Sequence, residues 1–147
     1  MKKYELTDDS ITFMGRKLFR IRAIRSFNDV AVGDLGGYIE KEENLSHDDD
    51  AWISGNACIC GNARICDDAW IHSGADYLCF QGLGSKNRNT TFFKCKDGHI
   101  HVSCGCFSGN LAEFETKVKK THSDSKYAKE YLACIEVVKI HFKEENK

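Results

Sequence analysis

The sequence predicts an α+β fold in which a β-rich N-terminal section precedes a module of two strands and two helices. Three observations support this fold class: short branched and aromatic stretches near the N-terminus, a six-residue repeat of Ile and Ala, and two amphipathic stretches near the C-terminus. With 147 residues the chain is long enough for one ordinary domain or two small ones. We place the division after residue 76, which gives predicted sections of 1–76 and 77–147.

Residues 1–39 contain three stretches that are typical of strands, namely YEL, ITF and KLFRIRAI, separated by the turn-like sequences TDDS and MGRK. In the third stretch, apolar residues alternate with Arg20 and Arg22, which predicts one buried face and one exposed face. The glycines of GDLGGYIE indicate a tight bend into the next segment.

A repeat with a period of six runs through ISGNAC, ICGNAR, ICDDAW and IHSGAD, each beginning with Ile and carrying Ala at its fifth position. This period is typical of a short hexapeptide β-helix of the left-handed type, in which Ile and Ala point inward and Gly, Asn and Asp form the corners. Three sides close one coil, so residues 18 apart should stack, with Trp52 over Trp70 and Ile53 over Ile71. Because the coil is so short, we expect the flanking sections to cover its ends.

Residues 77–89 are expected to form a linker or an irregular strand. The stretches TTFFKCK and HIHVSCGC then flank Asp97 and Gly98, a dipeptide that favours a hairpin turn. Asn110 and Glu113 have the spacing of a helix capping box, and a second helical stretch, SDSKYAKEYLACIEVVKIHFKEE, follows. The expected order is therefore strand, strand, helix, helix.

The chain has eight cysteines and no secretory signal, so we expect reduced thiols that bind a metal or are buried, rather than disulfides. The densest group of potential ligands is CKDGHIHVSCGC. We predict a structural zinc site, because zinc takes four Cys or His ligands in a tetrahedron. The predicted ligands are Cys95, Cys104, Cys106 and His122, with His141 as the main substitute. The alternative is a set of buried free thiols beside the hairpin.

His99 and His101 alternate with Ile100 and Val102, so the two histidines share one face of the predicted strand. We interpret them as solvent-facing residues. A second site, for a metal or an anion, is the alternative.

The net charge of −1 is unevenly distributed. Residues 1–85 carry nine Lys and Arg against fourteen Asp and Glu, and residues 86–147 carry twelve against eight. The acidic segment EKEENLSHDDD is a candidate surface for a basic partner, with a solvated loop as the alternative. Its acidic residues are Glu40, Glu42, Glu43, Asp48, Asp49 and Asp50.

The sequence lacks the signals of several protein classes. No stretch approaches the ~18 apolar residues of a membrane span, so we expect a cytoplasmic protein without membrane contact. No nucleophile-elbow motif, phosphate-binding loop or paired-carboxylate pattern occurs, so we expect no enzyme. One alternative is an acyltransferase-like enzyme with His72 as its base, and another is a nucleic-acid-binding or structural protein that uses the basic C-terminal section.

The stretch GDLGGYIEKEENLSHDDDAWISGNACICGNARICDDAWI, preceded by LFRIRA, resembles phage and prophage proteins with short hexapeptide repeats. The stretch from TTFFKCKDGHIHVSCGCF to SKYAKEYL is similar to a C-terminal module of such proteins, and Cys104, Cys106 and His122 fall in the core of its motif. Small cysteine-rich proteins of this kind include anti-CRISPR proteins. The resemblance implies a phage protein that binds and inhibits a host defence complex in the host cytoplasm, most concretely a CRISPR effector nuclease.

Overall fold

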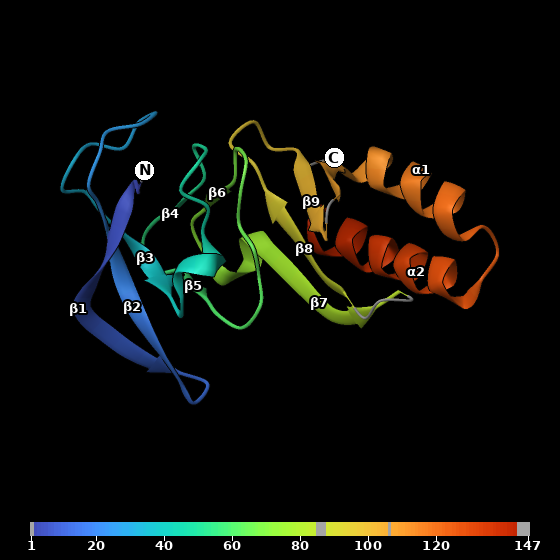
Figure 1. The fold of residues 1–147 in the computed structure, drawn as a ribbon, viewed down its shortest axis with the longest axis horizontal. Helices are drawn as coiled ribbons and strands as arrows, with labels where there is room; N and C mark the ends of the chain where they lie inside the picture. The colour runs from blue at the N-terminus through green and yellow to red at the C-terminus, as the bar shows by residue number, and fades with distance from the viewer. Residues whose placement is uncertain (1, 85–87, 106, 144–147) are drawn as a thin grey trace.

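A computed structural model describes residues 2–84, 88–105 and 107–143 of the chain (Figure 1). Its first section contains β1 (Tyr4–Phe13), β2 (Arg16–Ala23), β3 (Leu35–Ile39), the 3-10 helix η1 (Glu42–Asn44), β4 (Trp52–Ile53), β5 (Cys58–Ile59), β6 (Trp70–Ile71) and the 3-10 helix η2 (Gly74–Asp76). Its second section contains β7 (Tyr77–Leu83), β8 (Arg88–Lys94), β9 (Ile100–Cys104), β10 (Phe107–Asn110), α1 (Leu111–His122) and α2 (Lys126–His141). This content agrees with an α+β class.

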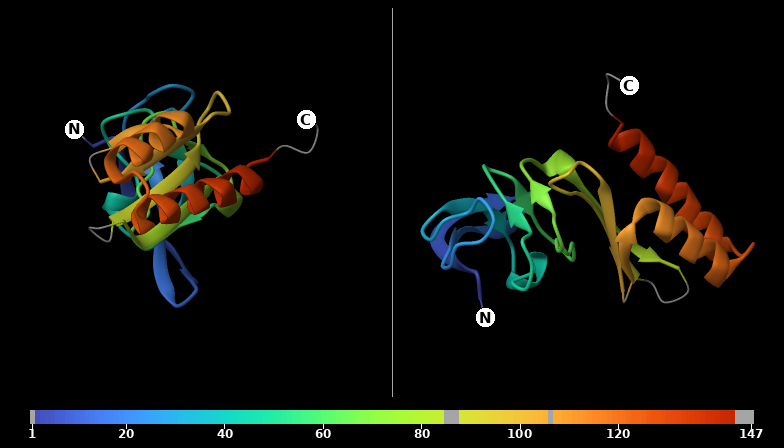
Figure 2. Two further views of the ribbon diagram at one scale, coloured as in Figure 1. Left: turned by 90° about the vertical axis from the view of Figure 1, so that its right-hand side faces the viewer. Right: turned by 90° about the horizontal axis from the view of Figure 1, so that it is seen from above.

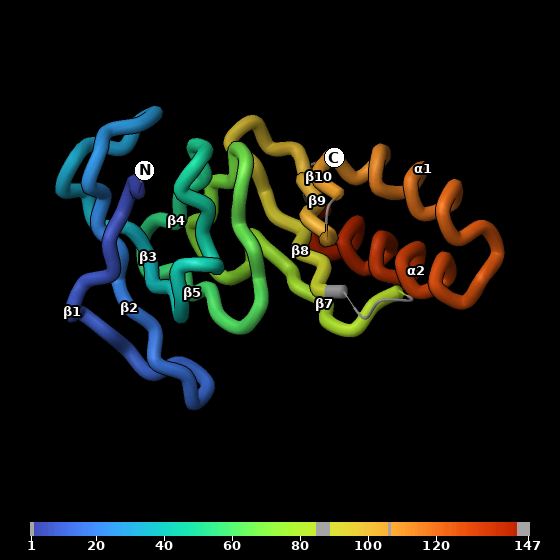
Figure 3. The backbone as a smooth tube through the Cα atoms, in the orientation of Figure 1, coloured from blue at the N-terminus to red at the C-terminus, as the bar shows by residue number. Residues whose placement is uncertain are grey.

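The first section is organised around a four-stranded sheet in the order β1-β2-β3-β5. The first three strands pair antiparallel, whereas β5 pairs parallel with β3. Strands β4 and β6 form a separate parallel pair. Figure 3 shows that the segment with the six-residue repeat lies between the β1–β2 hairpin and the antiparallel sheet of the second section.

The prediction of a hexapeptide β-helix is wrong. The repeat contributes only two-residue strands to the described structure, and these strands belong to two different sheets. The offset is 18 residues where Trp52 pairs with Trp70, but 20 where Tyr38 pairs with Cys58, so the strands do not wind with one pitch. The physical reason is that β5 pairs with β3, which already belongs to a longer antiparallel ladder. In addition, turns interrupt each hexad after two extended residues.

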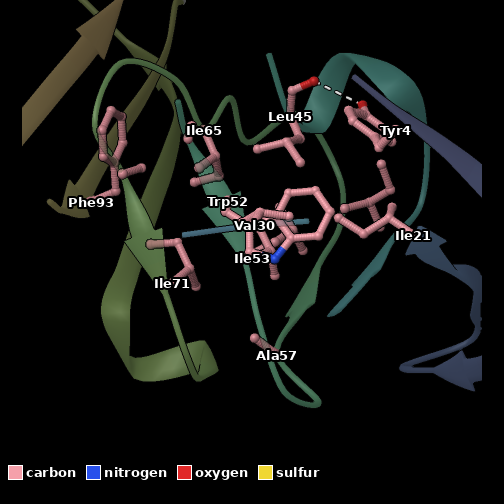
Figure 4. Close-up of a cluster of buried hydrophobic side chains, with 14 of the residues drawn as sticks. Tyr4, Ile21, Val30, Leu45, Trp52, Ile53, Ala57, Ile65, Ile71 and Phe93 are labelled. Carbon is pink, nitrogen blue, oxygen red and sulfur yellow. Dashed lines mark hydrogen bonds between the residues drawn. The ribbon is translucent and has the colours of Figure 1, made fainter. Parts of the chain in front are cut away.

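The repeat nevertheless has the predicted inward orientation. Its four Ile residues and the first three of its four Ala residues are buried, and they join β1–β3 in one core (Figure 4). Gly37 on β3 allows the repeat to approach closely, because a Cβ there would lie 2.6 Å from the carbonyl oxygen of Ala57 and 2.6 Å from Cγ2 of Ile53. Tyr4 closes the other side by donating its hydroxyl to the carbonyl of Leu45 at 2.8 Å.

The second section has four strands before its helices, not the two that the sequence predicted. They form an antiparallel sheet in the order β10-β9-β8-β7. Residues 77–83 of the segment that was expected to be a linker or an irregular strand form β7, whose register with β8 shifts between Phe80 and Leu83. Asn110 and Glu113 form the predicted capping box at the start of α1. No helix among the described residues is both long enough and apolar enough to cross a membrane.

Two hydrophobic cores lie on opposite faces of the second sheet. Phe92 on β8 packs with α1 and α2, whereas the next residue, Phe93, packs with the repeat of the first section. Neighbouring residues of a strand point to opposite faces, and both of these rings are fully buried. Figure 2 shows the helices on one side of this sheet and the first section on the other. The division into domains 1–76 and 77–147 stays a prediction.

We expect Gly37→Ala to lower the free energy of unfolding by about 3 kcal/mol, because its Cβ meets backbone that cannot move aside. Gly74→Ala is the control, since a Cβ at Gly74 has no atom within 4 Å. Urea unfolding of both variants measures the difference. Equal stability of the two variants would contradict the close packing of β3 against the repeat.

Candidate metal centre

The hairpin between β8 and β9 brings Cys95 and His99 opposite each other. Cys95 follows the last residue of β8, and its amide donates to the carbonyl of His99 at 2.9 Å. The amide of Gly98 closes the turn on the carbonyl of Cys95, also at 2.9 Å, with a φ of +95° that glycine adopts readily. The turn predicted from Asp97 and Gly98 is therefore present, and it positions two potential ligands.

His101 completes a group of three potential metal ligands. Residues two apart on a strand share a face, so His101 on β9 lies beside His99. The ligand atoms of Cys95, His99 and His101 all lie within 4.8 Å of one another. Cys95 is buried, and the side chains of His101 and His99 are 15% and 39% exposed. Thiolate and imidazole ligands of this kind suit zinc and other transition metals.

Asp97 determines which nitrogen of His99 faces this group. The carboxylate of Asp97 contacts Nδ1 of His99 and accepts the His99 backbone amide at 2.9 Å. These hydrogen bonds lower the pKa of Asp97, so at neutral pH the carboxylate is ionised and can only accept. In the neutral ring Nδ1 carries the proton, and Nε2 presents a lone pair toward His101.

Ser108 and Asp67 determine the tautomer of His101. Nε2 of His101 lies 2.8 Å from the hydroxyl oxygen of Ser108 and 2.9 Å from the carboxylate of Asp67. The hydroxyl donates its one proton to Asp67 at 2.9 Å, so it can only accept from His101. Nε2 therefore carries the proton, and Nδ1 of the neutral ring presents a lone pair toward His99.

Two nitrogen lone pairs consequently face each other across 3.4 Å, from Nε2 of His99 and Nδ1 of His101. This arrangement is repulsive in neutral rings, because neither nitrogen has a proton to donate. Two nitrogens that bind one tetrahedral zinc at about 2.0–2.1 Å lie about 3.4 Å apart. A proton on one of these nitrogens or a metal cation between the rings removes the repulsion, and a metal cation would have Cys95 as its third ligand. The group of Cys95, His99 and His101 can therefore bind a metal.

The surroundings of Cys95 favour a cation. Burial, followed by the nearby carboxylates of Asp97, Asp68 and Asp67, raises the pKa of the Cys95 thiol to about 12. The same carboxylates lower the energy of a positive charge beside the thiol. The site is therefore unfavourable for an isolated thiolate and favourable for a thiolate that is bound to a metal ion.

The structure does not bring Cys104 to Cys95, contrary to the sequence prediction. Paired residues of a hairpin are equally far from its turn, so the residue opposite Cys95 is His99. Cys104 instead pairs with Thr90, whose hydroxyl donates to its sulfur at 3.1 Å, and both face the helices. The two cysteines therefore belong to different cores.

His122 and His141 also lie away from Cys95. The ring of His122 stacks on Tyr131 with a centroid distance of 5.7 Å, and Nε2 of His141 donates to the carbonyl of Ala75 at 2.7 Å. Within the described ranges, neither histidine belongs to a group of potential metal ligands. Cys106 lies outside the described residues, so the predicted four-ligand set as a whole stays a prediction.

His99 and His101 were expected to face solvent, with a second metal or anion site as the alternative, and neither was expected to meet Cys95. A signal was present, because Cys95, Asp97, His99 and His101 occupy alternate positions. This alternation places a thiol, two imidazoles and an orienting carboxylate around one tight turn.

The six acidic residues of the candidate partner surface divide into two groups. Glu40, Glu42 and Asp49 accept hydrogen bonds from basic side chains or backbone amides of the first section. The other three are exposed, and their carboxylates have no hydrogen-bond partner among the described residues. This exposed group consists of Glu43, Asp48 and Asp50.

Among the described residues, two of the cavities lie near the junction of the sections, and neither opens on the metal-binding group. One of about 620 Å³ is lined by residues that include Lys2, Glu43 and Ser103. The other, of about 250 Å³, is lined by residues that include Ile100 and His141. Cys95, His99 and His101 line neither of them.

Comparison with known proteins adds no relative to this description. No family of proteins matches the chain in a search of family profiles. No curated protein matches it either. The assignment of a function therefore depends on the residues and geometry described above.

Proposed function

We propose that the protein is a non-catalytic interaction protein whose fold is stabilised by a structural zinc ion bound to Cys95, His99 and His101. The observation that carries this proposal is the 3.4 Å approach of Nε2 of His99 to Nδ1 of His101, because the other nitrogen of each ring lies against a hydrogen-bond acceptor. Zinc suits these three ligands, because it binds thiolate and imidazole in a tetrahedron, whose fourth corner a water molecule or a further side chain would take. Of the ligands predicted from the sequence, Cys95 is retained.

The location of the metal centre supports a stabilising role. Ala69 of the first section forms a β-bridge with Cys95, and the amide of Lys96 donates to the carbonyl of Asp68 at 2.9 Å. The ammonium of Lys96 also pairs with Asp29 at 2.6 Å. A metal ion in the hairpin would therefore restrain several contacts between the two sections at once.

Neither of the two cavities described above opens on the metal-binding group, which supports a non-catalytic role. A catalytic zinc keeps an open coordination position that faces a substrate pocket. Both cavities described above are lined by other residues. The acyltransferase alternative with His72 loses its support, because that chemistry needs the stacked coils of a β-helix.

The proposed partner is a host defence complex in the cytoplasm, most concretely a CRISPR effector nuclease. Its support is the sequence resemblance to phage proteins together with the exposed carboxylates of Glu43, Asp48 and Asp50. Such nucleases hold nucleic acid in positively charged channels, and an acidic surface is complementary to these channels.

Protein purified without added metal and without a polyhistidine tag is expected to contain about one zinc per chain. We expect His99→Gln to abolish zinc binding, because it removes a ligand. Elemental analysis and the zinc-dependent shift in Tm measure the effect.

The matched control is His122→Gln, which changes a histidine of the sequence-predicted set and should leave zinc content unchanged. If zinc were lost in His122→Gln and retained in His99→Gln, the ligand set predicted from the sequence would be favoured instead. Metal-free wild-type protein whose Tm does not respond to zinc would overturn the zinc site.

Charge reversal confined to Glu43→Lys, Asp48→Lys and Asp50→Lys is expected to leave the fold intact, because these exposed carboxylates accept no hydrogen bond from the described residues. Wild-type protein should slow target cleavage by a purified CRISPR effector nuclease. The triple variant should inhibit less by on the order of tenfold, with a weaker dependence on salt.

The control for total charge reverses three exposed carboxylates elsewhere, with Asp8→Lys, Asp124→Lys and Glu136→Lys. This control should inhibit like the wild type. Equal inhibition by the two triple variants would refute the acidic surface, and no inhibition by wild-type protein across a panel of effectors would refute the proposed partner.

A further inference from the structure

Asp67 reaches the metal centre from the first section of the chain. Its carboxylate lies 2.9 Å from Nε2 of His101 and accepts the hydroxyl of Ser108 at 2.9 Å. Its backbone has a φ of +57°, in the left-handed region that Asp, Asn and Gly enter most easily. This backbone conformation turns the carboxylate toward β9 and β10.

Contacts with Asp49, and through it with Lys3, hold the backbone of Asp67 in place. Its backbone amide donates to the carboxylate of Asp49 at 2.6 Å. The fully buried ammonium of Lys3 lies 3.7 Å from the other oxygen of Asp49 and donates to the carbonyls of Asp49 and Ala51 at 2.8 and 2.5 Å. The chain of contacts from Lys3 through Asp49 to Asp67 thus begins in the core of the first section.

We propose that Asp67 is a positioning residue for the metal centre, which orients His101 from the first section and thereby fastens that section to the β8–β9 hairpin. This inference rests on the proposed zinc site. A carboxylate that accepts the distal N–H of a histidine ligand selects its tautomer, orients its ring and raises its basicity. Asp97 does this directly for His99. Asp67 acts on His101 through Ser108, whose hydroxyl accepts from Nε2 and donates to the carboxylate, and the carboxylate itself lies 2.9 Å from Nε2.

The geometry distinguishes this role from direct coordination. Asp67 contacts Nε2 of His101, whereas the nitrogen that faces His99 is Nδ1. The carboxylate is therefore on the side of the ring that points away from the three ligand atoms. Replacing Asp67 should weaken metal binding without changing the ligands of the metal.

The test compares Asp67→Gly, Asp67→Asn and the control Asp68→Asn, which changes the neighbouring exposed carboxylate. Glycine accepts the positive φ at this position, so the first variant removes the carboxylate without straining the backbone. Zinc affinity is measured by competition with a chromophoric chelator, and the ligand set is read from the absorption spectrum of the cobalt-substituted protein.

We expect Asp67→Gly to bind zinc 10–100-fold more weakly, on the order of the losses that follow removal of such partners. Its cobalt spectrum should keep the wild-type band positions. Asp67→Asn should restore part of the affinity, because the amide oxygen still accepts from the hydroxyl of Ser108 beside Nε2. Asp68→Asn removes a charge near Cys95 but no contact with His101, so it should weaken binding less than Asp67→Gly. Equal zinc affinity in all variants, or a changed cobalt spectrum in Asp67→Gly, would overturn the positioning role.

A second measurement separates this inference from the zinc site itself. In metal-free protein at neutral pH, the ¹⁵N shifts of the His101 ring report which nitrogen carries the proton. We expect a single Nε2–H tautomer in the wild type and a mixture in Asp67→Gly. Mixed tautomers in the wild type would refute the role of Asp67 even if zinc binds, whereas one tautomer without zinc binding would refute only the proposed function.

Discussion

Strand β8 is buried on both faces, and most of the architecture depends on this constraint. Phe92 and Phe93 point in opposite directions and are each fully buried, one against the helices and the other against the repeat. Burial of one such ring contributes about 1.5–3 kcal/mol, so both sections gain stability from the same strand. The second sheet therefore separates two hydrophobic cores and contributes side chains to both.

The location of the candidate metal centre follows from the burial of this sheet on both faces. His101 pairs with Phe93 across β8 and β9, and their rings lie 5.5 Å apart, so His101 faces the first section. Cys95 lies two residues beyond Phe93 and faces the same core. The potential ligands thus gather on the face of the sheet where Asp67 can reach them from the repeat. A site on the other face would be enclosed by the helices.

Acidic residues have two different roles in this molecule. Asp49 and Asp67 are part of a continuous set of polar contacts that begins at the buried Lys3 and ends at His101. A single buried lysine is costly unless it is paired, and the carbonyls and carboxylate around Lys3 meet that requirement. The exposed carboxylates of Glu43 and Asp48 have no hydrogen-bond partner among the described residues and belong to the proposed partner surface.

Local features of the fold could be predicted from the sequence alone. The period of six identified which Ile and Ala residues point inward, the Asp97–Gly98 dipeptide identified the hairpin turn, and Asn110 with Glu113 identified the start of a helix. Each of these features depends on side-chain periodicity or turn chemistry within a few residues. This short range explains why they could be recognised without any knowledge of the tertiary contacts.

Only the tertiary structure decided which strands pair and which potential ligands meet. The repeat was compatible with a β-helix, but β5 pairs with β3 of the N-terminal sheet. Paired residues are 18 apart in one parallel pair and 20 apart in the other, so the strands do not form regular coils. Likewise, the register of β8 and β9 placed His99 rather than Cys104 opposite Cys95. The sequence by itself determined which side chains are apolar or can bind a metal. Their neighbours depend on strand register and on long-range packing, because a shift of one residue turns every side chain to the opposite face.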